Sequence, residues 1–360
     1  MKISTLNVYS YFLALTAATP TPTQNHAAVD LEKAHALGKR ATVSDKATVG
    51  FATQNGGTSG GSGGTVTTVS TLAQFTSAVD EKSKAPAIVV VQGVISGNTK
   101  VRIGSNRTIF GLPGAGFNGV GLLFRKQSNL ILRNIVSSSV LATNGDGIGI
   151  ENSTNVWIDH CEFYSALTSN KDLYDGLVDV THGSDFVTIS NTYFHHHWKT
   201  SLVGHSDRNG NEDKGRLRIT YANNHWNNCG SRGPSLRFGT GHIYNSYYEN
   251  THSAINTRMG AQVLVENNVF KNVTNPITSV DSPEVGYAIS INNDLGSGAN
   301  RAPNGTLLAS SIPYQYSLIS PLTINTTIPG EAGAILTFAP TNGTAHWGQG
   351  SWLARARKLW

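Results

Sequence analysis

The chain has 360 residues, and only 14% of them are charged. That length is enough for one large or elongated domain. The net charge of +5 and isoelectric point of about 9.1 come without a dense lysine and arginine run, so nucleic-acid binding is not indicated. No stretch after the N-terminal region is long and apolar enough to predict a membrane span.

The N-terminal region resembles a secretory leader. Residues 1–18 combine Lys2, a short apolar run and small residues, which predicts a signal peptide. Residues 19–40 end in a dibasic pair, which is either the cleavage site of a pro-segment or an ordinary surface pair. We therefore expect a secreted, extracellular protein whose main domain spans residues 41–340. Residues 341–360 form an atypical C-terminal extension.

The cysteines and sequons agree with secretion. Cys161 and Cys229 are compatible with one disulfide, although the sequence does not show whether they meet. Six Asn-x-Ser/Thr sequons offer glycosylation sites wherever they are exposed.

The first elements of the main domain follow a glycine-rich stretch. Residues 54–64 have the composition of a flexible linker, but a strand is predicted directly after them at 66–69, so we expect a folded segment. Residues 70–79 have the pattern of a capped amphipathic helix, and residues 87–91 that of a strand. The helix is expected to cap the domain at its N-terminal end.

From residue 130 onward the chain repeats a short β-rich run, a polar turn residue and an aromatic or aliphatic residue. The aligned turn residues are Arg133, His160, Asn191, Asn223, Asn245 and Asn267. Their separations are 27, 31, 32, 22 and 22 residues, whereas the hairpins of a β-sandwich recur every 8–12 residues or so. The fold class predicted is all-β, a parallel β-helix in which stacked asparagines form a ladder.

Two aspartates stand in an apolar run after residue 173. Leu177, Val178 and Val180 predict a strand, in which Asp175 and Asp179 point to one face about 13 Å apart. They can share a small ion only if the chain bends, which Gly176 permits. On spacing alone, the favoured interpretation is two surface aspartates on a solvated strand.

Inserts in the longer units carry the remaining charged residues of interest. Successive coils of a β-helix lie about 4.8 Å apart, so long turns on one side of the coils build a groove. The residues brought to that groove are Asp146, Asp175, Asp179, Lys199 and Arg232. The run His195–His197 is not expected to hold one ion, because side chains alternate faces in a strand. Asp159 is expected to be structural, and Trp198 either stacks on sugar or fills a turn.

Several ordered motifs closely resemble those of family 1 pectate lyases, and most closely the secreted fungal branch. They are Trp157-Ile158-Asp159-His160, the 175–185 run, the strand at 187–191, the 199–207 run and the Arg232-x-Pro-x-x-Arg237 motif. The likeness extends from about Gly50 to Phe338. It implies a right-handed parallel β-helix that cleaves polygalacturonate by calcium-dependent β-elimination.

The resemblance also assigns roles to residues. Asp146, Asp175 and Asp179 match the family's calcium-binding carboxylates, while Asn144 stands where the family often has an acidic residue. Arg232 matches the base that abstracts the proton. The residues that match the substrate-binding cations are Lys199, Arg237 and Arg258.

The residue types suit that chemistry. Calcium takes oxygen ligands and can bridge protein carboxylates and a uronate, and cations neutralise the charge that develops on the substrate. Arginine is normally protonated, so a base at Arg232 predicts an alkaline optimum. The expected partner is polygalacturonate, or pectin, acted on by a monomer.

Other function classes stay open. A polygalacturonase would carry Asn-Thr-Asp and Asp-Asp clusters, which do not occur here. A pectin lyase acting on methyl-esterified pectin would not need the carboxylates. A non-catalytic carbohydrate-binding β-helix would have no use for the three cations Lys199, Arg232 and Arg237.

Overall fold

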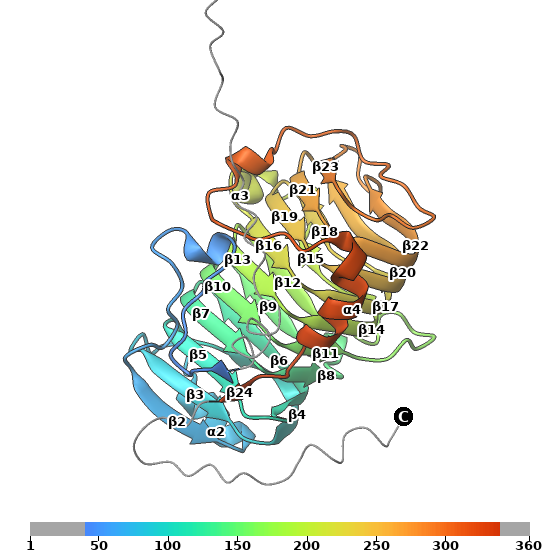
Figure 1. Ribbon diagram of the computed structural model, residues 1–360. Coiled ribbons are helices and arrows are strands. Elements are labelled where there is room, and N and C mark those ends of the chain that lie inside the picture. Colours follow the sequence, from blue (N-terminus) through green and yellow to red (C-terminus); the bar gives the residue numbers. More distant parts are fainter. Residues whose placement is uncertain (1–39, 339–360) are drawn as a thin grey trace, which may run out of the picture. The chain divides into compact units, whose positions relative to one another are not determined.

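The computed structural model describes residues 40–338; the expected signal peptide, most of the pro-segment and the C-terminal extension lie outside them. Within these residues every pairing between named strands is parallel, and successive coils stack in chain order (Figure 1). The predicted right-handed parallel β-helix is confirmed. No β-sandwich is formed.

One sheet takes a single strand from each coil, because each coil repeats the same apolar run. Its ten strands are β2 Thr65–Val69, β3 Ala87–Val91, β5 Arg107–Gly111, β7 Ser128–Arg133, β10 Thr154–Asp159, β13 Asp185–Ser190, β16 Arg218–Ala222, β19 Thr240–Tyr244, β21 Gln262–Glu266 and β23 Tyr287–Ile291.

The other two sides of each coil belong to a second sheet, which is continuous because β6, β20 and β22 run round the corner between them. Its strands are β4 Val94–Arg102, β6 Gly116–Arg125, β8 Val136–Ser138, β9 Ile148–Glu151, β11 Glu162–Tyr164, β12 Val178–Thr181, β14 Tyr193–Lys199, β15 Leu202–Val203, β17 His225–Ser231, β18 Ser235–Arg237, β20 Tyr247–Arg258 and β22 Val269–Thr278.

Short elements complete the coils. Helix α2, Leu72–Ala78, is the predicted N-terminal cap; Thr71 and Gln74 form its capping box, and Phe75 packs on Phe117 with ring centroids 4.6 Å apart. Helix α4, Pro321–Glu331, covers Tyr247 and Val269 with two buried isoleucines. The remaining elements are η1 Phe51–Thr53, η2 Ala142–Asn144, α3 Gly210–Asp213, η3 Ala309–Ser311 and the two-stranded pair β1 Arg40–Ala41 and β24 Thr337–Phe338.

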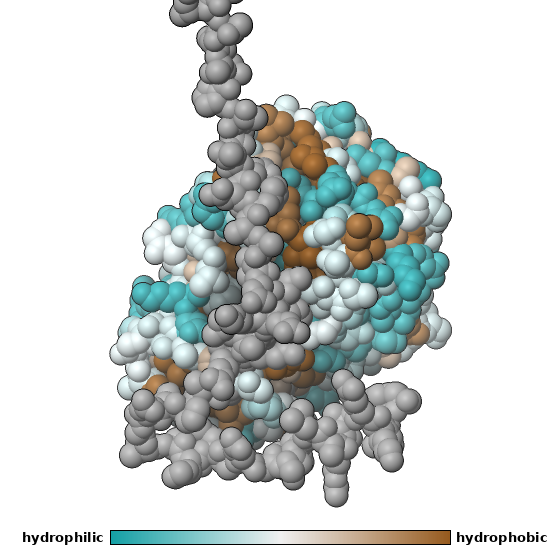
Figure 2. Space-filling model, in the orientation of Figure 1, coloured by the Kyte–Doolittle hydropathy of each residue, from teal (hydrophilic) through white to brown (hydrophobic). Residues whose placement is uncertain are grey.

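The core is a column of apolar side chains inside the coils. One row of stacked aromatic rings runs through five successive coils: Phe163, Phe194, Trp226, Tyr248 and Phe270, with centroids 4.2–5.6 Å apart. Stacking of equivalent positions therefore supplies both burial and a fixed register. On the face seen in Figure 2, hydrophobic residues form several groups between hydrophilic ones.

The polar ladder is confirmed with one correction. Residues in the left-handed region stand on successive coils at His160, Asn191, Asn223, Asn245 and Asn267, and the amide of Asn223 donates to Asn191 at 3.1 Å. In the preceding coil the turn residue is Asn134, not Arg133, because Arg133 pairs in register with Asp159. The predicted alignment of that first unit is wrong by one residue.

The glycine-rich segment before β2 is folded, as expected. The backbone amides of Ser59 and Gly60 each donate to the side chain of Asn129 at 2.7 Å, which holds this segment on the first sheet. No helix among residues 40–338 is long and apolar enough to cross a membrane.

Candidate functional site

The residues of the candidate site lie on neighbouring coils, at or just before strands of one side of the second sheet. The strands β9, β12, β15, β18 and β20 stack in that order. Asp179 pairs with Gly149, and Arg237 pairs with Arg258. Seven residues separated by up to 112 positions are thereby brought to adjacent coils: Asp146, Asp175, Asp179, Lys199, Arg232, Arg237 and Arg258.

Asp146 and Asp179 carry carboxylates whose charge is poorly compensated. Asp179 is 7% exposed and accepts a hydrogen bond from the Leu202 amide at 3.0 Å. Burial, followed by repulsion from Asp146, raises the pKa of Asp179 well above its usual value. Burial and the charge of Asp175 raise the pKa of Asp146 to about 7. Such mutual repulsion is typical of carboxylates arranged to receive a cation.

The chain bends directly before strand β12, so the prediction that Asp175 belongs to the strand is wrong. β12 begins at Val178, and Asp175 ends the loop that precedes it. Gly176 is needed here for space, because a Cβ at this position would collide with the carboxylate of Asp179. The bend brings Asp175 close enough to repel both other carboxylates.

Lys199 ends strand β14 and faces the same loop. Its Nζ lies 3.4 Å from Asp175 and 3.0 Å from Asp172, a residue that the sequence did not single out. Lys199 is thus placed within reach of a carboxylate of the candidate cluster. Because Asp172 is 86% exposed, its ion pair with Lys199 contributes little stability.

Arg232 stands at a turn in the left-handed region, with φ of 61°. Its carbonyl accepts from the Ser201 amide at 2.8 Å, which fixes the backbone. Its charge lowers the pKa values of both Asp146 and Asp179, against the larger effect of burial. Among the residues that the structure describes, none forms a hydrogen bond or ion pair with its guanidinium.

In contrast to Arg232, Arg237 and Arg258 have side chains that hydrogen bonds hold in place. Arg237 is 7% exposed; its Nε donates to Asp207 at 2.5 Å and one terminal nitrogen donates to the Gly204 carbonyl at 2.8 Å. The Nε of Arg258 donates to Ser282 at 2.7 Å, and Ser282 in turn donates to Asp207. Asp207 therefore orients both arginines.

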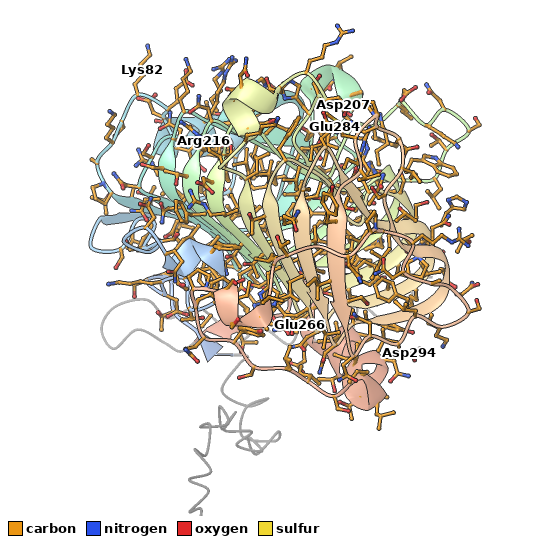
Figure 3. All side chains as sticks on the ribbon, turned by 90° about the horizontal axis from the view of Figure 1, so that it is seen from above. Lys82, Asp207, Arg216, Glu266, Glu284 and Asp294 are labelled. Atoms are coloured by element: carbon orange, nitrogen blue, oxygen red, sulfur yellow. The ribbon has the colours of Figure 1, made fainter. Side chains whose placement is uncertain are left out.

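Asp207 is a residue whose role the sequence interpretation missed. It closes the 199–207 motif, so the signal was present in the sequence. Although burial raises the pKa of Asp207, the hydrogen bonds from Arg237 and Ser282 hold it below its usual value. Asp207 lies on the same side of the coils as Glu284, across from Glu266 (Figure 3).

The carboxylates suit an oxygen-seeking divalent cation. All three predicted ligands are carboxylates, and burial together with mutual repulsion raises the pKa values of Asp146 and Asp179. A hard divalent cation bound between them would offset the unfavourable charge. Within residues 40–338, however, no three His, Cys, Asp or Glu side chains already converge with metal-binding geometry. Asp175 faces Lys199 instead.

The contacts of Asp159 and Trp198 show what each side chain does in the fold. Asp159 is structural, as predicted: it is 1% exposed and accepts from Arg133 at 2.9 Å and from Ser190 at 2.7 Å. The indole of Trp198 donates to the Thr168 carbonyl at 2.8 Å and lies under Lys171, so it secures a loop.

The three histidines do not alternate faces as expected. His196 has φ of 50°, and this turn brings its Nδ1 within 2.8 Å of the Nδ1 of His195. His197 is buried and contacts the loop before β12. His195 and His196 therefore lie side by side, while His197 points to the loop before β12.

The two cysteines are unpaired, so a disulfide between them is excluded. Cys161 and Cys229 are buried on different coils, and each thiol lies against backbone carbonyls. Burial raises the pKa of both thiols to about 12, which leaves them unreactive.

The comparisons with known proteins agree with this geometry. A family model described as pectate lyase matches residues 26–334. The chain belongs to the pectate lyase family. It is 52% identical over 326 residues to a probable pectate lyase A of Aspergillus fumigatus, covering 90% of this chain and 96% of that protein. It is 51% identical over 304 residues to a pectate lyase B of Colletotrichum gloeosporioides, covering 84% and 90% respectively.

Solved structures agree as well. A pectate lyase from Bacillus sp. N165, solved in complex with trigalacturonate, has a TM-score of 0.72 and 32% identity, over 81% of this chain and 99% of that one. The protein is therefore a polysaccharide lyase with pectate lyase function.

Proposed function

We propose that this pectate lyase cleaves polygalacturonate by calcium-dependent β-elimination and releases 4,5-unsaturated oligogalacturonides. The observation that carries the proposal is the cluster of Asp146, Asp175 and Asp179, with raised pKa values at two members, beside an Arg232 guanidinium without an ion-pair partner among the described residues. The related Bacillus enzyme was solved with trigalacturonate, which supports the same substrate class here.

In this proposal Asp146, Asp175 and Asp179 hold calcium. When bound, the ion supplies a positive charge that neutralises the substrate carboxylate and so acidifies the proton on C5. Lys199, Arg237 and Arg258 bind uronate carboxylates. The fixed orientation of Arg237 and Arg258 through Asp207 means that little ordering is needed when substrate arrives.

Arg232, in its neutral form, removes the C5 proton. The electron pair of that C–H bond forms the C4–C5 double bond, the C4–O bond breaks, and the leaving oxygen takes a proton from solvent. Lys199 and Arg237 stabilise the negative charge that builds up on the carboxylate before the C4–O bond breaks. The lack of an ion-pair partner on Arg232 among the described residues suits a base better than a clamp.

The test is the release of unsaturated product from polygalacturonate with and without EDTA. We expect chelation to abolish activity and added calcium to restore it. A parallel assay on highly methyl-esterified pectin distinguishes the rival activity, because a pectin lyase would prefer that polymer and keep its rate in EDTA.

We further propose that the protein is secreted and acts as a monomer outside the cell. Residues 1–18 have the pattern of a signal peptide, and residues 19–40 that of a pro-segment. The N-terminal sequence and the mass of the secreted protein test both cleavage sites. Size-exclusion chromatography of that material tests the monomer.

A further inference from the structure

The loop of residues 165–176 is fastened to strand β14 by three consecutive side chains. The ring of His197 contacts its two ends, the indole of Trp198 donates to Thr168 in its outer part, and Lys199 pairs with Asp172 and Asp175. Trp198 and Lys199 act at or near the surface. His197 is 2% exposed and acts at the base of the loop.

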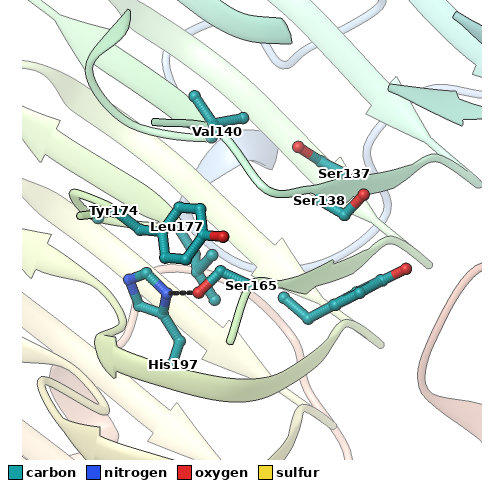
Figure 4. Close-up of a pocket in the computed structure, with 10 residues that line it drawn as sticks. Ser137, Ser138, Val140, Ser165, Tyr174, Leu177 and His197 are labelled. Atoms are coloured by element: carbon teal, nitrogen blue, oxygen red, sulfur yellow. Dashed lines mark hydrogen bonds between the residues drawn. The ribbon is translucent and has the colours of Figure 1, made fainter. Parts of the chain in front are cut away.

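The contacts of His197 fix its hydrogen-bonding roles. Its Nε2 lies 2.5 Å from the carbonyl oxygen of Asp175, and a carbonyl only accepts, so Nε2 donates. Its Nδ1 lies 2.6 Å from the Ser165 hydroxyl, and the neutral ring accepts there (Figure 4). The surroundings form a cavity of only about 10 Å³, lined in part by Tyr174 and Leu177, which leaves the ring little room to turn.

The peptide group between Asp175 and Gly176 is held at both of its polar atoms. Its carbonyl accepts from His197, and its amide donates to a carboxylate oxygen of Asp146 at 3.0 Å. A single peptide therefore links two of the three carboxylates proposed to bind calcium. Gly176 has no side chain to restrict rotation of this peptide, so its direction depends on these two hydrogen bonds. The next peptide is fixed separately, because the Gly176 carbonyl accepts from the Gly147 amide at 3.0 Å.

We propose that His197 is a positioning residue that locks the Asp175–Gly176 peptide and thereby fixes Asp146 and Asp175 relative to each other. The inference rests on the calcium site of the proposed function. Without the His197 bond this peptide keeps only its bond to Asp146 and can tilt. Asp146 and Asp175 then no longer hold the fixed spacing that a shared ion requires. The rest of the loop stays in place, because Trp198 and Lys199 hold it independently.

Two substitutions separate the two bonds of His197. His197→Gln places an amide nitrogen near the position of Nε2 and keeps a donor for the Asp175 carbonyl. His197→Asn keeps an acceptor near Nδ1 for Ser165 but is too short to reach Asp175. The matched control is His196→Asn, because asparagine occupies the equivalent left-handed position in the next coils, at Asn228 and Asn250.

Calcium affinity is measured by isothermal titration calorimetry, without substrate. We expect His197→Asn to weaken calcium binding about 10–100-fold, the usual effect of losing a hydrogen bond behind a metal ligand. His197→Gln should recover affinity to within a few-fold of wild type, and His196→Asn should leave it unchanged. If both His197 variants lose affinity equally while their melting temperatures fall together, the residue is merely structural and the inference fails.

Hydrogen exchange of the calcium-free protein gives a second readout, which does not depend on the ion. The peptide covering residues 165–177 should exchange faster in His197→Asn than in wild type, His197→Gln or His196→Asn. Unchanged exchange there overturns the inference. If wild-type protein binds no calcium at all, the proposed calcium site fails by itself, and exchange alone then decides whether His197 locks the loop.

Discussion

Asp159 and Asp179 are both buried aspartates on strands of neighbouring coils, yet their surroundings push their ionisation in opposite directions. Despite burial, the charges of His160 and Arg133 and the hydrogen bonds around it hold the pKa of Asp159 far below its usual range. Around Asp179 the second largest influence is another carboxylate, and its pKa is raised. The first aspartate is fully compensated and the second is not.

The difference separates structure from function within one fold. A buried charge that is paired and hydrogen-bonded holds strands in register, and removing its partner is costly. A buried carboxylate beside another carboxylate does not stabilise the fold by itself. Such arrangements are typical of sites that bind a ligand. Substitutions at the two kinds of site should therefore change catalysis, calcium binding and stability in different ways.

Arg232→Lys should lower kcat on polygalacturonate by about 10²–10⁴-fold at saturating calcium, with little change in KM. Lysine keeps the positive charge but moves the nitrogen that would take the C5 proton. Arg237→Lys is the comparison, and it should raise KM as well, because a fixed guanidinium contributes to ground-state binding. Near-normal turnover in Arg232→Lys would remove this residue from the role of base and make Lys199 the next candidate.

Asp159→Asn should destabilise the protein by about 3–5 kcal/mol, the usual cost of breaking a buried ion pair. Arg133 would keep its bond to the half-exposed Asp45 but lose its buried partner. Urea denaturation with matched m-values measures the difference. A loss below about 1 kcal/mol would show that Asp159 is not compensated as its contacts indicate.

Asp179→Asn should have the opposite profile. In calcium-free protein the free energy of unfolding should equal or exceed that of wild type, because an unfavourable charge is removed while Oδ1 still accepts from Leu202. Calcium binding should weaken about tenfold or more, since a charged ligand is lost. Asp175→Asn serves as its partner variant, and unchanged calcium affinity in both would place the ion elsewhere.

The pH dependence of stability should differ in sign between the two regions. The pKa of Asp159 is lowered, so its contribution is present above about pH 4 and is lost as the pH falls further. The pKa of Asp146 is raised to about 7, so its contribution is present below about pH 4 and is lost as the pH rises through 7. Each proton changes stability by at most about 1.4 kcal/mol per pH unit.

Denaturation in EDTA between pH 3 and 8 tests this prediction. Asp146→Asn should reduce the decline between about pH 4 and 7, because Asp179 also has a raised pKa and accounts for the rest of it. The loss of stability below about pH 4 should be unchanged. Asp159→Asn should reduce the loss of stability below about pH 4 and leave the decline between about pH 4 and 7 unchanged. Identical curves of stability against pH for the two variants would contradict the assignment of these changes to Asp159 and Asp146.

The repeat, the coils and the column of site residues could be predicted because each depends on periodic residue types. The aromatic row and the asparagine ladder are examples, since every coil offers the same position to the next. The one-residue error at Arg133 arose because arginine and asparagine are adjacent polar residues there, and only the pairing of Arg133 with Asp159 decides between them.

What escaped prediction depends on contacts between different coils or on single backbone angles. The left-handed conformation of His196 leaves no mark in the sequence, because histidine replaces the asparagine found in the next coils. The link from Asp207 to Arg258 joins residues 51 positions apart and follows only from the stacking of two turns. The separation of the two thiols likewise depends on which coil each enters.

The pairing of β1 with β24 has a consequence for timing. Coils contact their neighbours and can form in order along the chain, but Arg40 pairs with Thr337, which is made almost 300 residues later. That joint can close only at the end of folding. A processing protease has to bind the chain around Arg40 in extended form, and the closed joint already occupies this backbone. Removal of residues 19–40 would therefore have to precede the pairing of β1 with β24 or wait until this two-residue pairing opens.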